Sequence, residues 1–594
     1  MKKLNVILLL VAMISLVGLG AVLVFADGEG KEKDSDLKQY QDGYVENTGR
    51  NKDIIVKVME GLGEPSAEVY DLAFQKQIRE LLTKMVTENE YNEDTPLIVY
   101  NPFRTNSQSL YVYFETSEPY AISYSVHVQD STLPNFGGNV VPVSTETSMV
   151  HEFQITGLLP EEVNMITLRM VGADGLVMIR RFYYQNDHKV AATEVFLETE
   201  AGTKQVVNEE DDTVSTVPAS KETLSDGMFV AFPKENELKP YLRMYDNHGI
   251  QRAEIPLKTF GTKRILLHEN RMYYRISETE IAALNHLGQV EQIYTAEGYR
   301  FGTDYTLDKD NNLLVIASDK KQNSVNDCVL LINSKSGEVK ELVDLGDLLP
   351  DYKKICKEQN GVLDWIALNS IAWETGNQIV LSSEKTGVIL KIRRLYNDPK
   401  LVYLIGDAER FVGTPYESLF LRLDNEFEMH DGVNMAGILP YDKIRESRHY
   451  IYLLNNNKDA EYGKKEEPVS YYYRYLVDEA EFGVRLMGSL VLSGVALDGS
   501  VQWHEEHLVT AGDLKPEFYE YDNDFNLITK FTYHEPKVEY TEEQLEHIED
   551  YPLPDGTVQF VRVLKYDFYG YFFMEQPTIV VPPSPSPEPT SSLE

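Results

Sequence analysis

The sequence is poor in cysteine, tryptophan and basic residues. Only two of its 594 residues are cysteine and three are tryptophan, and 56 Lys and Arg stand against 95 Asp and Glu, a net charge of -39. Two cysteines are too few for a cysteine-rich metal site. So acidic a surface repels phosphate backbones and anionic lipid, so we expect no nucleic-acid partner and attribute the acidity to solubility.

Cys328 and Cys356 are the two cysteines. Outside the cytoplasm they would form a disulfide if their Cα atoms came close enough, which the sequence does not show. Two buried free thiols are the alternative.

Several catalytic motifs are also missing. The chain has no H-E-x-x-H, G-x-S-x-G or P-loop, the motifs of zinc proteases, α/β-hydrolases and NTPases. Two strings, Asp308-K-D-N-N and Asp522-N-D-F-N, imitate the start of a calcium loop. The sixth position of such a loop is Gly, but here it is Leu313 or Leu527. We therefore expect hairpin turns and no metal.

The chain begins with two lysines and an apolar run. Residues 4–25 contain only Asn5 and Ser15 as strongly polar interruptions, and Val24-Phe25-Ala26 offers small residues at −3 and −1 for cleavage. Residues 1–26 therefore predict an export signal. The run is also long enough to span a bilayer, so an uncleaved N-terminal anchor is the alternative. Either way we expect an extracytoplasmic protein, secreted or anchored to the outer face of the membrane only through this segment.

Residues 27–93 combine a charged, Gly-bearing tether with an amphipathic helix that starts near Pro65. The apolar residues of the helix recur near a period of 3.6, and such a stripe packs against the protein's own body or against a second copy in a homodimer. They are Val69, Leu72, Ala73, Ile78, Leu81, Leu82 and Met85.

The rest of the chain reads as mainly β, which its 38 tyrosines also favour. Residues 94–190 hold short segments that alternate with period two, typical of a β-sandwich. From 225 to 575, turn signals recur at spacings of roughly 40–50 residues, which predicts a β-propeller with its site at the channel mouth. The Pro- and Ser-rich residues 580–594 predict a disordered tail.

Two strings carry a family resemblance. Asp364-W-I-A-L-N-Ser370 and Glu384-K-T-G-V-I-L-Lys391 resemble the D-W-x-H-x-N-S motif and the following S-S-R-x-x-S-A-V-I-K strand of the bacterial aryl-sulfate sulfotransferases. Asn101 to Pro119 resembles the opening of their N-terminal domain, and the resemblance covers about 95–575. It implies a six-bladed propeller that moves a sulfuryl group from an aryl sulfate to a phenol, without PAPS, metal or other cofactor.

The resemblance also assigns roles to two residues. The family's transiently sulfurylated histidine matches His430 in E-M-H-D, and its motif asparagine matches Asn369, whose amide would donate to a sulfuryl oxygen. A neutral imidazole is a competent nucleophile when an acceptor holds its other nitrogen. The alternatives are a solvated loop histidine and an asparagine that closes a turn.

Three family positions are degenerate. Ala367 and Thr303 stand where the family has histidines, and Glu384 stands at its arginine. Lys385 follows directly but faces the opposite side of a strand. Loss of one donor costs about 3 kcal/mol of transition-state stabilisation, so we expect sulfuryl transfer to be weakened or lost. The alternative function is a catalytically degenerate propeller that binds a ligand or a surface partner. A cationic side chain beside His430 would favour the transferase.

Overall fold

The computed structural model describes most of the chain between residues 69 and 534 and a shorter segment near the C-terminus. The predicted export segment, the first part of the tether and the Pro- and Ser-rich tail lie outside the described residues. No helix within the described residues is long and apolar enough to cross a membrane. The described residues are 40–42, 54–59, 69–128, 131–142, 149–186, 195–207, 213–233, 241–258, 262–439, 447–457, 469–492, 499–512, 515–534 and 560–576.

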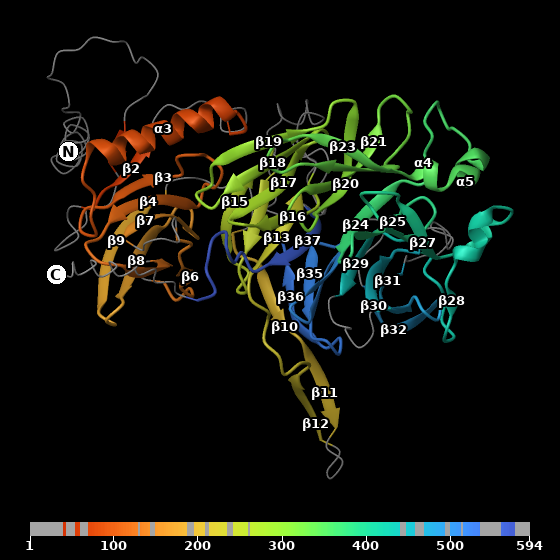
Figure 1. Cartoon of the computed structure of the whole chain (residues 1–594). Coiled ribbons are helices and arrows are strands. Elements are labelled where there is room, and N and C mark those ends of the chain that lie inside the picture. The colour runs from red at the N-terminus through yellow and green to blue at the C-terminus, as the bar shows by residue number, and fades with distance from the viewer. Residues whose placement is uncertain are drawn as a thin grey trace, which may run out of the picture. The chain divides into compact units, whose positions relative to one another are not determined.

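The N-terminal module is a sandwich of two sheets (Figure 1). Alternate residues of its strands point into a shared core that includes Phe114, Ile122, Phe153, Ile166 and Phe182. One sheet has the order β1 (Tyr40–Asp42), β2 (Val56–Met59), β3 (Leu97–Tyr100), β4 (Ser109–Glu115), β7 (Val150–Thr156); the other has β6 (Phe136–Asn139), β5 (Tyr120–Val128), β8 (Val163–Gly172), β9 (Val177–Gln185). The period-two pattern predicted β4, β5, β7, β8 and β9. It did not identify β3 or β6, and β1 and β2 correct the prediction, because they lie in residues expected to form the tether, before the predicted sandwich boundary at 94.

Helix α3 (Leu72–Glu88) packs on the outer face of the sandwich. It begins after Asp71, whose side chain accepts a hydrogen bond from the Ala73 N–H at 2.8 Å. Ile78 and Leu82 of the helix are buried in a cluster with residues of β3 and β4 and with Leu287 of the propeller. Ile78, Leu82 and Met85 of the predicted stripe thus pack against the protein's own body, whereas Leu72 and Ala73 are exposed.

Six further sheets form the blades of the propeller. Each has at least four strands, which are named here from the inner strand outward. Blade 1 is β37 (Phe560–Tyr566), β13 (Met228–Pro233), β14 (Tyr241–Tyr245), β15 (Gln251–Pro256); blade 2 is β16 (Ile265–His268), β17 (Arg271–Ser277), β18 (Glu280–Asn285), β19 (Val290–Thr295); blade 3 is β20 (Tyr299–Leu307), β21 (Leu313–Asp319), β22 (Cys328–Ile332), β23 (Val339–Asp344).

The other three blades follow the same order, and two of them carry an additional outer strand. Blade 4 is β24 (Leu368–Glu374), β25 (Gln378–Ser383), β26 (Ile389–Arg393), β27 (Lys400–Ile405); blade 5 is β29 (Met435–Leu439), β30 (Arg448–Asn455), β31 (Ser470–Asp478), β32 (Gly483–Leu492), β28 (Arg422–Leu423); blade 6 is β33 (Ser500–His504), β34 (His507–Ala511), β35 (Glu517–Tyr521), β36 (Leu527–Thr532), β10 (Glu198–Ala201). The predicted mainly β fold, a sandwich followed by a propeller, is confirmed.

Two pairings join the ends of the propeller. The C-terminal strand β37 pairs with β13 and supplies the inner strand of blade 1, with Leu564 opposite Val230. The early strand β10 pairs with β36 at the outer edge of blade 6. Closure of this kind leaves few open sheet edges.

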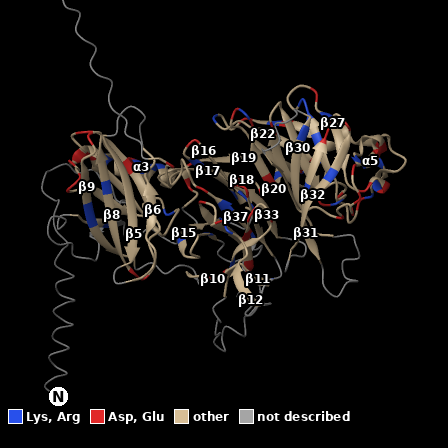
Figure 2. Cartoon of the chain, turned by 90° about the horizontal axis from the view of Figure 1, so that it is seen from below, with Lys and Arg blue, Asp and Glu red and all other residues tan. Residues whose placement is uncertain are grey.

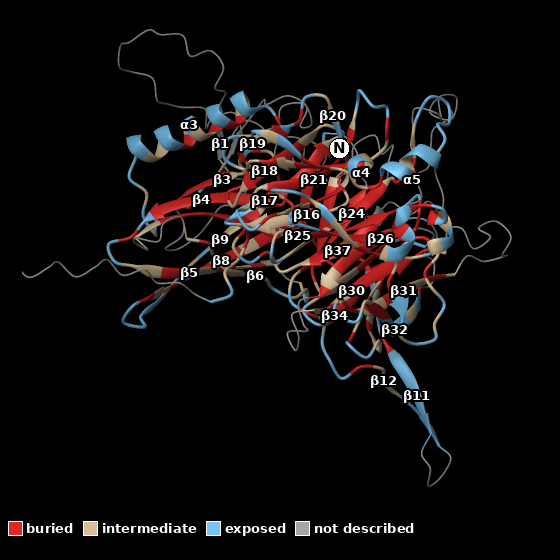
Figure 3. Cartoon of the chain, turned by 45° about the vertical axis from the view of Figure 1, so that its right-hand side comes forward, coloured by how far each residue is buried: buried red, intermediate tan, exposed pale blue. Residues whose placement is uncertain are grey.

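Short elements decorate the blades. Helices α4 (Leu345–Leu348) and α5 (Pro350–Ile355) and two short 3₁₀ helices, Ala408–Phe411 and Pro415–Leu419, follow blades 3 and 4. The hairpin β11 (Thr203–Val207) and β12 (Val214–Pro218) is exposed, in contrast to the buried blades (Figure 3).

The open questions about cysteine and calcium have structural answers. Cys328 and Cys356 are both free thiols. In the two Asp-rich strings the first aspartate caps its own turn: Asp308 Oδ1 accepts the Asn312 N–H at 2.9 Å, and Asp522 Oδ1 accepts the Asn526 N–H at 2.8 Å. Both strings are therefore hairpin turns, as predicted.

Candidate functional site

The five predicted site residues come from three neighbouring blades. Thr303 lies on β20, and Asn369 lies on β24 with Ala367 just before it. Glu384 lies in the turn that follows β25, and His430 lies in the segment before β29. The inner strands β20, β24 and β29 contact one another in sequence. These residues therefore gather at the end of the channel where β24 and β29 begin.

Ala367 and Glu384 are adjacent across one blade. The Ala367 carbonyl accepts the Glu384 N–H at 2.9 Å. Ala367 has a φ of 41°, in the left-handed region that side-chain-bearing residues rarely occupy and that occurs most often at turns and functional sites. Lys385 Nζ pairs with Asp364 at 3.2 Å. Lys385 lies in the same turn as Glu384 and not on a strand, so the alternation of faces expected from a strand does not apply to it.

Asn369 connects blades 3, 4 and 5. Its Nδ2 donates to the Val433 carbonyl at 2.7 Å, and its Oδ1 accepts the Ser382 hydroxyl at 2.6 Å. The Thr303 hydroxyl donates to the Asn369 carbonyl at 3.4 Å. The side chain is 4% exposed, so the amide is rigidly oriented.

His430 is 2% exposed and has a partner on each ring nitrogen. Nε2 lies 2.8 Å from the Gly387 carbonyl, and Nδ1 lies 2.9 Å from the Tyr475 hydroxyl. A carbonyl only accepts, so Nε2 carries the proton and Nδ1 accepts from Tyr475. Burial lowers the pKa of His430 to about 4. The imidazole is thus neutral, as a nucleophile must be, but its lone pair is already engaged by Tyr475.

A buried arginine crosses to this site from the opposite side of the channel. Arg562 of β37 is 2% exposed, and its Nη2 donates to Asn434 Oδ1 at 3.4 Å. Asn434 directly follows Val433, the hydrogen-bond partner of Asn369. The guanidinium is therefore linked to the predicted oxyanion donor through two successive residues, Val433 and Asn434.

A second arginine lies beside Thr303. Arg264 Nη1 lies 3.3 Å from Asp304 Oδ1 and donates to the Ile371 carbonyl at 3.4 Å. Asp304 Oδ2 in turn accepts the Ile371 N–H at 2.8 Å. This ion pair joins the inner strands of blades 2, 3 and 4 and offsets much of the charge of Arg264.

Tyr452 packs over the inner strand of blade 5 because that strand has a glycine there. A Cβ on Gly437 would lie 2.4 Å from the Tyr452 hydroxyl oxygen. Burial raises the pKa of Tyr452, and the charge of Arg264 opposes that rise. The phenol thus lies within the electrostatic reach of Arg264 and adds a neutral O–H to this polar region.

Another polar cluster lies between blades 4 and 5. One ligand atom each of Glu374, His449 and Glu479 lies within 4.8 Å of the others. The Lys391 ammonium, however, lies 2.6 Å from Glu374 and also pairs with Glu479. Burial and the Lys391 charge lower the pKa of His449 to about 3. An ammonium already balances these carboxylates, so we interpret the cluster as an internal ion network.

Sequence reasoning missed Arg264 and Arg562. Arg562 lies in the strand F-V-R-V-L-K-Y, where cations interrupt an apolar run. That interruption was the one available signal, but the strand alone does not reveal which residue points into a channel. Elsewhere charges of both signs are interspersed along strands and loops (Figure 2).

Comparison with protein-family models gives two matches. Residues 213–489 match the model described as arylsulfotransferase (ASST), and residues 97–183 match the arylsulfotransferase Ig-like domain. The first match includes all five predicted site residues and Arg264, and Arg562 lies beyond it. No curated protein sequence matches the chain.

Solved structures resemble the chain only remotely. A protein of unknown function from Bacteroides caccae has 10% identity and a TM-score of 0.34, and the match covers 57% of this chain and 99% of that one. TolB from Acinetobacter baumannii has 10% identity and a TM-score of 0.32, with 63% of this chain and 77% of that chain covered. Likeness at this level carries no functional argument.

Proposed function

The chain belongs to the arylsulfotransferase family, and on that premise we propose that the channel mouth binds an aryl sulfate and transfers its sulfuryl group slowly to a phenol. The observation that carries the proposal is the hydrogen bond of Arg562 to Asn434, whose chain neighbour Val433 is bound by Asn369. A sulfuryl group in transfer spreads negative charge over its oxygens, and a buried cation with preorganised donors stabilises that charge. Arg562 supplies positive charge that the motif positions lack.

The nucleophile is the weaker part of the proposed site. In the first half of the transfer, sulfur bonds to Nδ1 of His430 as its bond to the aryl oxygen breaks, and the leaving phenolate takes a proton. In the second half, the sulfur–nitrogen bond breaks as sulfur bonds to the acceptor phenol oxygen, and the proton that the acceptor loses replaces the one taken. Attack by Nδ1 requires the Tyr475 O–H to turn away from it. Together with the changes at Ala367, Thr303 and Glu384, this geometry supports slow turnover.

The test is turnover and binding of 4-nitrophenyl sulfate with phenol as acceptor. We expect slow release of 4-nitrophenolate and saturable binding that Arg562→Gln weakens roughly 10- to 100-fold, the value of one charged hydrogen bond. The control is Arg485→Gln, which removes an exposed arginine from β32. Equal binding by wild type and Arg562→Gln would contradict the proposal.

A second experiment asks whether the lost family residues limit the rate. The triple change Ala367→His, Thr303→His and Glu384→Arg should raise turnover, because it restores two imidazoles and reverses one charge. Mass spectrometry of the peptide that contains His430 should then show the added mass of one SO₃ group. A triple variant no faster than wild type would argue against this account.

The second candidate function is binding without transfer. It is favoured by one observation, the engagement of both His430 nitrogens. Binding of aryl sulfate with no product after prolonged incubation, and no sulfurylated His430, would select it. For either function we propose an extracytoplasmic location, which rests on residues 1–26 alone.

A further inference from the structure

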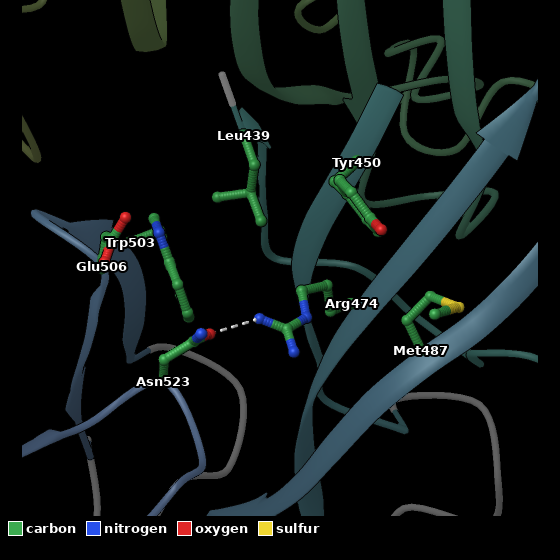
Figure 4. A pocket seen from close by; sticks show the side chains of 7 residues that line it. All are labelled: Leu439, Tyr450, Arg474, Met487, Trp503, Glu506 and Asn523. Carbon is green, nitrogen blue, oxygen red and sulfur yellow. Dashed lines mark hydrogen bonds between the residues drawn. The ribbon is translucent and has the colours of Figure 1, made fainter. Parts of the chain in front are cut away.

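A pocket of about 330 Å³ lies between blades 5 and 6 (Figure 4). Blade 5 contributes Leu439, Tyr450, Arg474 and Met487, and blade 6 contributes Trp503 on β33. Small-molecule sites in proteins have volumes of roughly 300–1,000 Å³ and are mostly apolar with a few fixed polar groups. The pocket meets both criteria.

The pocket is separate from the channel mouth. Leu439 is the last residue of β29, whereas Asn434 precedes its first residue. A strand rises about 3.3 Å per residue, so these two positions lie roughly 16 Å apart along the strand. Trp503 likewise lies near the end of β33. A ligand in this pocket would therefore not touch Asn369 or Arg562.

Arg474 is held rigidly at the pocket. Its guanidinium carbon lies 5.3 Å from the ring centroid of Trp503 and 5.4 Å from that of Phe525. Its Nη1 donates to Asn523 Oδ1 at 3.0 Å, and Figure 4 shows the side chain reaching toward Asn523. Both rings lie within cation–π distance of the guanidinium, whose N–H groups all lie in its own plane, the geometry suited to a planar anion.

Arg474 forms no ion pair with a carboxylate in the described part of the chain, where its one hydrogen bond is to the neutral amide of Asn523. Trp503 Nε1, also at the pocket, is buried and has no hydrogen-bond partner among the described residues. The net charge of the chain is -39, yet the Arg474 guanidinium pairs with no carboxylate of the described residues. It is therefore able to bind an external anion.

The walls and the rim define the ligand further. Trp503, Tyr450, Leu439 and Met487 offer flat or flexible apolar surface, which suits an aromatic ring. Glu506 also lines the pocket and is exposed. Its carboxylate repels a second negative charge, so a monoanion binds better than a dianion.

We propose that this pocket binds a small aromatic monoanion, with the ring against Trp503 and Tyr450 and the anionic group on the edge of Arg474. An aryl sulfate or an aryl carboxylate has this chemistry. An aryl phosphate, which carries a charge of about −1.5 to −2 near neutral pH, has one charge too many. Ligand binding in this pocket does not depend on sulfuryl transfer at the channel mouth.

The test uses the full-length Arg562→Gln variant, in which binding at the channel mouth is weakened, and calorimetric titration with 4-methylphenyl sulfate. We expect saturable binding that an added Arg474→Gln weakens roughly 10- to 100-fold. An added Arg485→Gln, the same charge change on the neighbouring strand, should leave it unchanged. Equal affinity with and without Arg474→Gln would overturn the site.

Two comparisons test the class of ligand. 4-Methylphenyl phosphate and the neutral 4-methylanisole should each bind more weakly than the sulfate. Glu506→Gln should narrow the preference for sulfate over phosphate, and this readout stays informative if Arg474→Gln does not fold. Tighter binding of the phosphate, or equal binding of the neutral analogue, would refute a monoanion site. Loss of turnover at the channel mouth in Arg562→Gln, with pocket binding intact, separates the two proposals.

Discussion

At the scale of single residues, the polar core of the propeller consists of groups that are buried and fully oriented. His430, Asn369 and Arg562 each show 4% exposure or less, and each contacts a group on another blade. Burial without such partners would cost each group its desolvation energy. These side chains therefore stabilise the blade contacts as well as the proposed site.

The first prediction concerns His430 and pH. Its native pKa, about 4, lies below its ordinary value of 6.5, so the unfolded state binds the proton first as the pH falls. Neutral His430 therefore contributes fully to the free energy of unfolding above pH 6.5. As the pH falls from 6.5 to about 4, up to roughly 3 kcal/mol of this contribution is lost. Denaturant unfolding of His430→Gln should show a weaker pH dependence in this window than wild type.

His248 provides the matched control for this experiment. It is an exposed histidine on the surface of the protein, so His248→Gln should keep the pH dependence of wild type. If His430→Gln and His248→Gln had the same pH profile, the depressed pKa of His430 would be refuted.

The second prediction concerns Gly437. A Cβ there would lie 2.4 Å from the Tyr452 hydroxyl, closer than atoms pack, so Gly437→Ala must displace the ring. We expect a loss of about 1–3 kcal/mol in the free energy of unfolding. Thermal unfolding measures it, and Gly437→Ala should cost less in a Tyr452→Ala background, where no ring remains to be displaced. A Gly437→Ala protein as stable as wild type would rule out the close packing.

At the scale of elements, α3 contacts the propeller through buried side chains, and Gln75 is the polar one among them. Gln75 Nε2 donates to the carbonyls of Val69 and Phe103 at 2.7 and 3.0 Å, and its Oε1 accepts the Val290 N–H at 3.1 Å. Val290 begins β19 of blade 2. Gln75, a fully buried polar residue of α3, thus makes contacts that the apolar stripe of the helix did not predict.

The third prediction follows from these bonds. Gln75→Ala leaves three buried backbone groups without partners, at about 1–3 kcal/mol each when none is rehydrated. We expect a loss of at least about 2 kcal/mol, and faster proteolysis between the sandwich and the propeller. Lys76→Ala, on the exposed face of the same helix, is the control. Equal protease resistance of the two variants would contradict the coupling.

At the scale of the whole molecule, closure depends on the last described strand. β37 joins residues 560–566 to β13 and carries Arg562 into the channel. Without it blade 1 would lose its inner strand and the ring would be open. The fold and the proposed anion site therefore depend on the same strand.

The fourth prediction tests that dependence. A chain ending at residue 559 should lose cooperative thermal unfolding, because an open propeller exposes the edges and the apolar core of blade 1. A chain ending at residue 576 keeps every described strand and should unfold as wild type does. Differential scanning calorimetry compares the two. Identical unfolding of both truncations would show that closure does not require β37.

Much of the architecture was predictable because its signals are local. Period-two alternation depends only on neighbouring residues, so the strands of the sandwich and the recurring turns of the propeller were visible in the sequence. The roles assigned to His430 and Asn369 came from motif matches and stay predictions. Arg264 and Arg562 were not identified, because the direction of a side chain into a central channel depends on the position of every blade.

The sequence by itself determined the mainly β class, the order of sandwich and propeller, the acidic surface and the loss of three family residues at Ala367, Thr303 and Glu384. Only the tertiary structure decided that Arg562 lies beside Asn434, that Tyr475 engages His430, and that Arg474 and Trp503 form a pocket between two blades. The physical reason is how far apart in the sequence the interacting residues lie. Strand periodicity is set by adjacent residues, whereas the charge around a buried group is set by residues more than one hundred positions away.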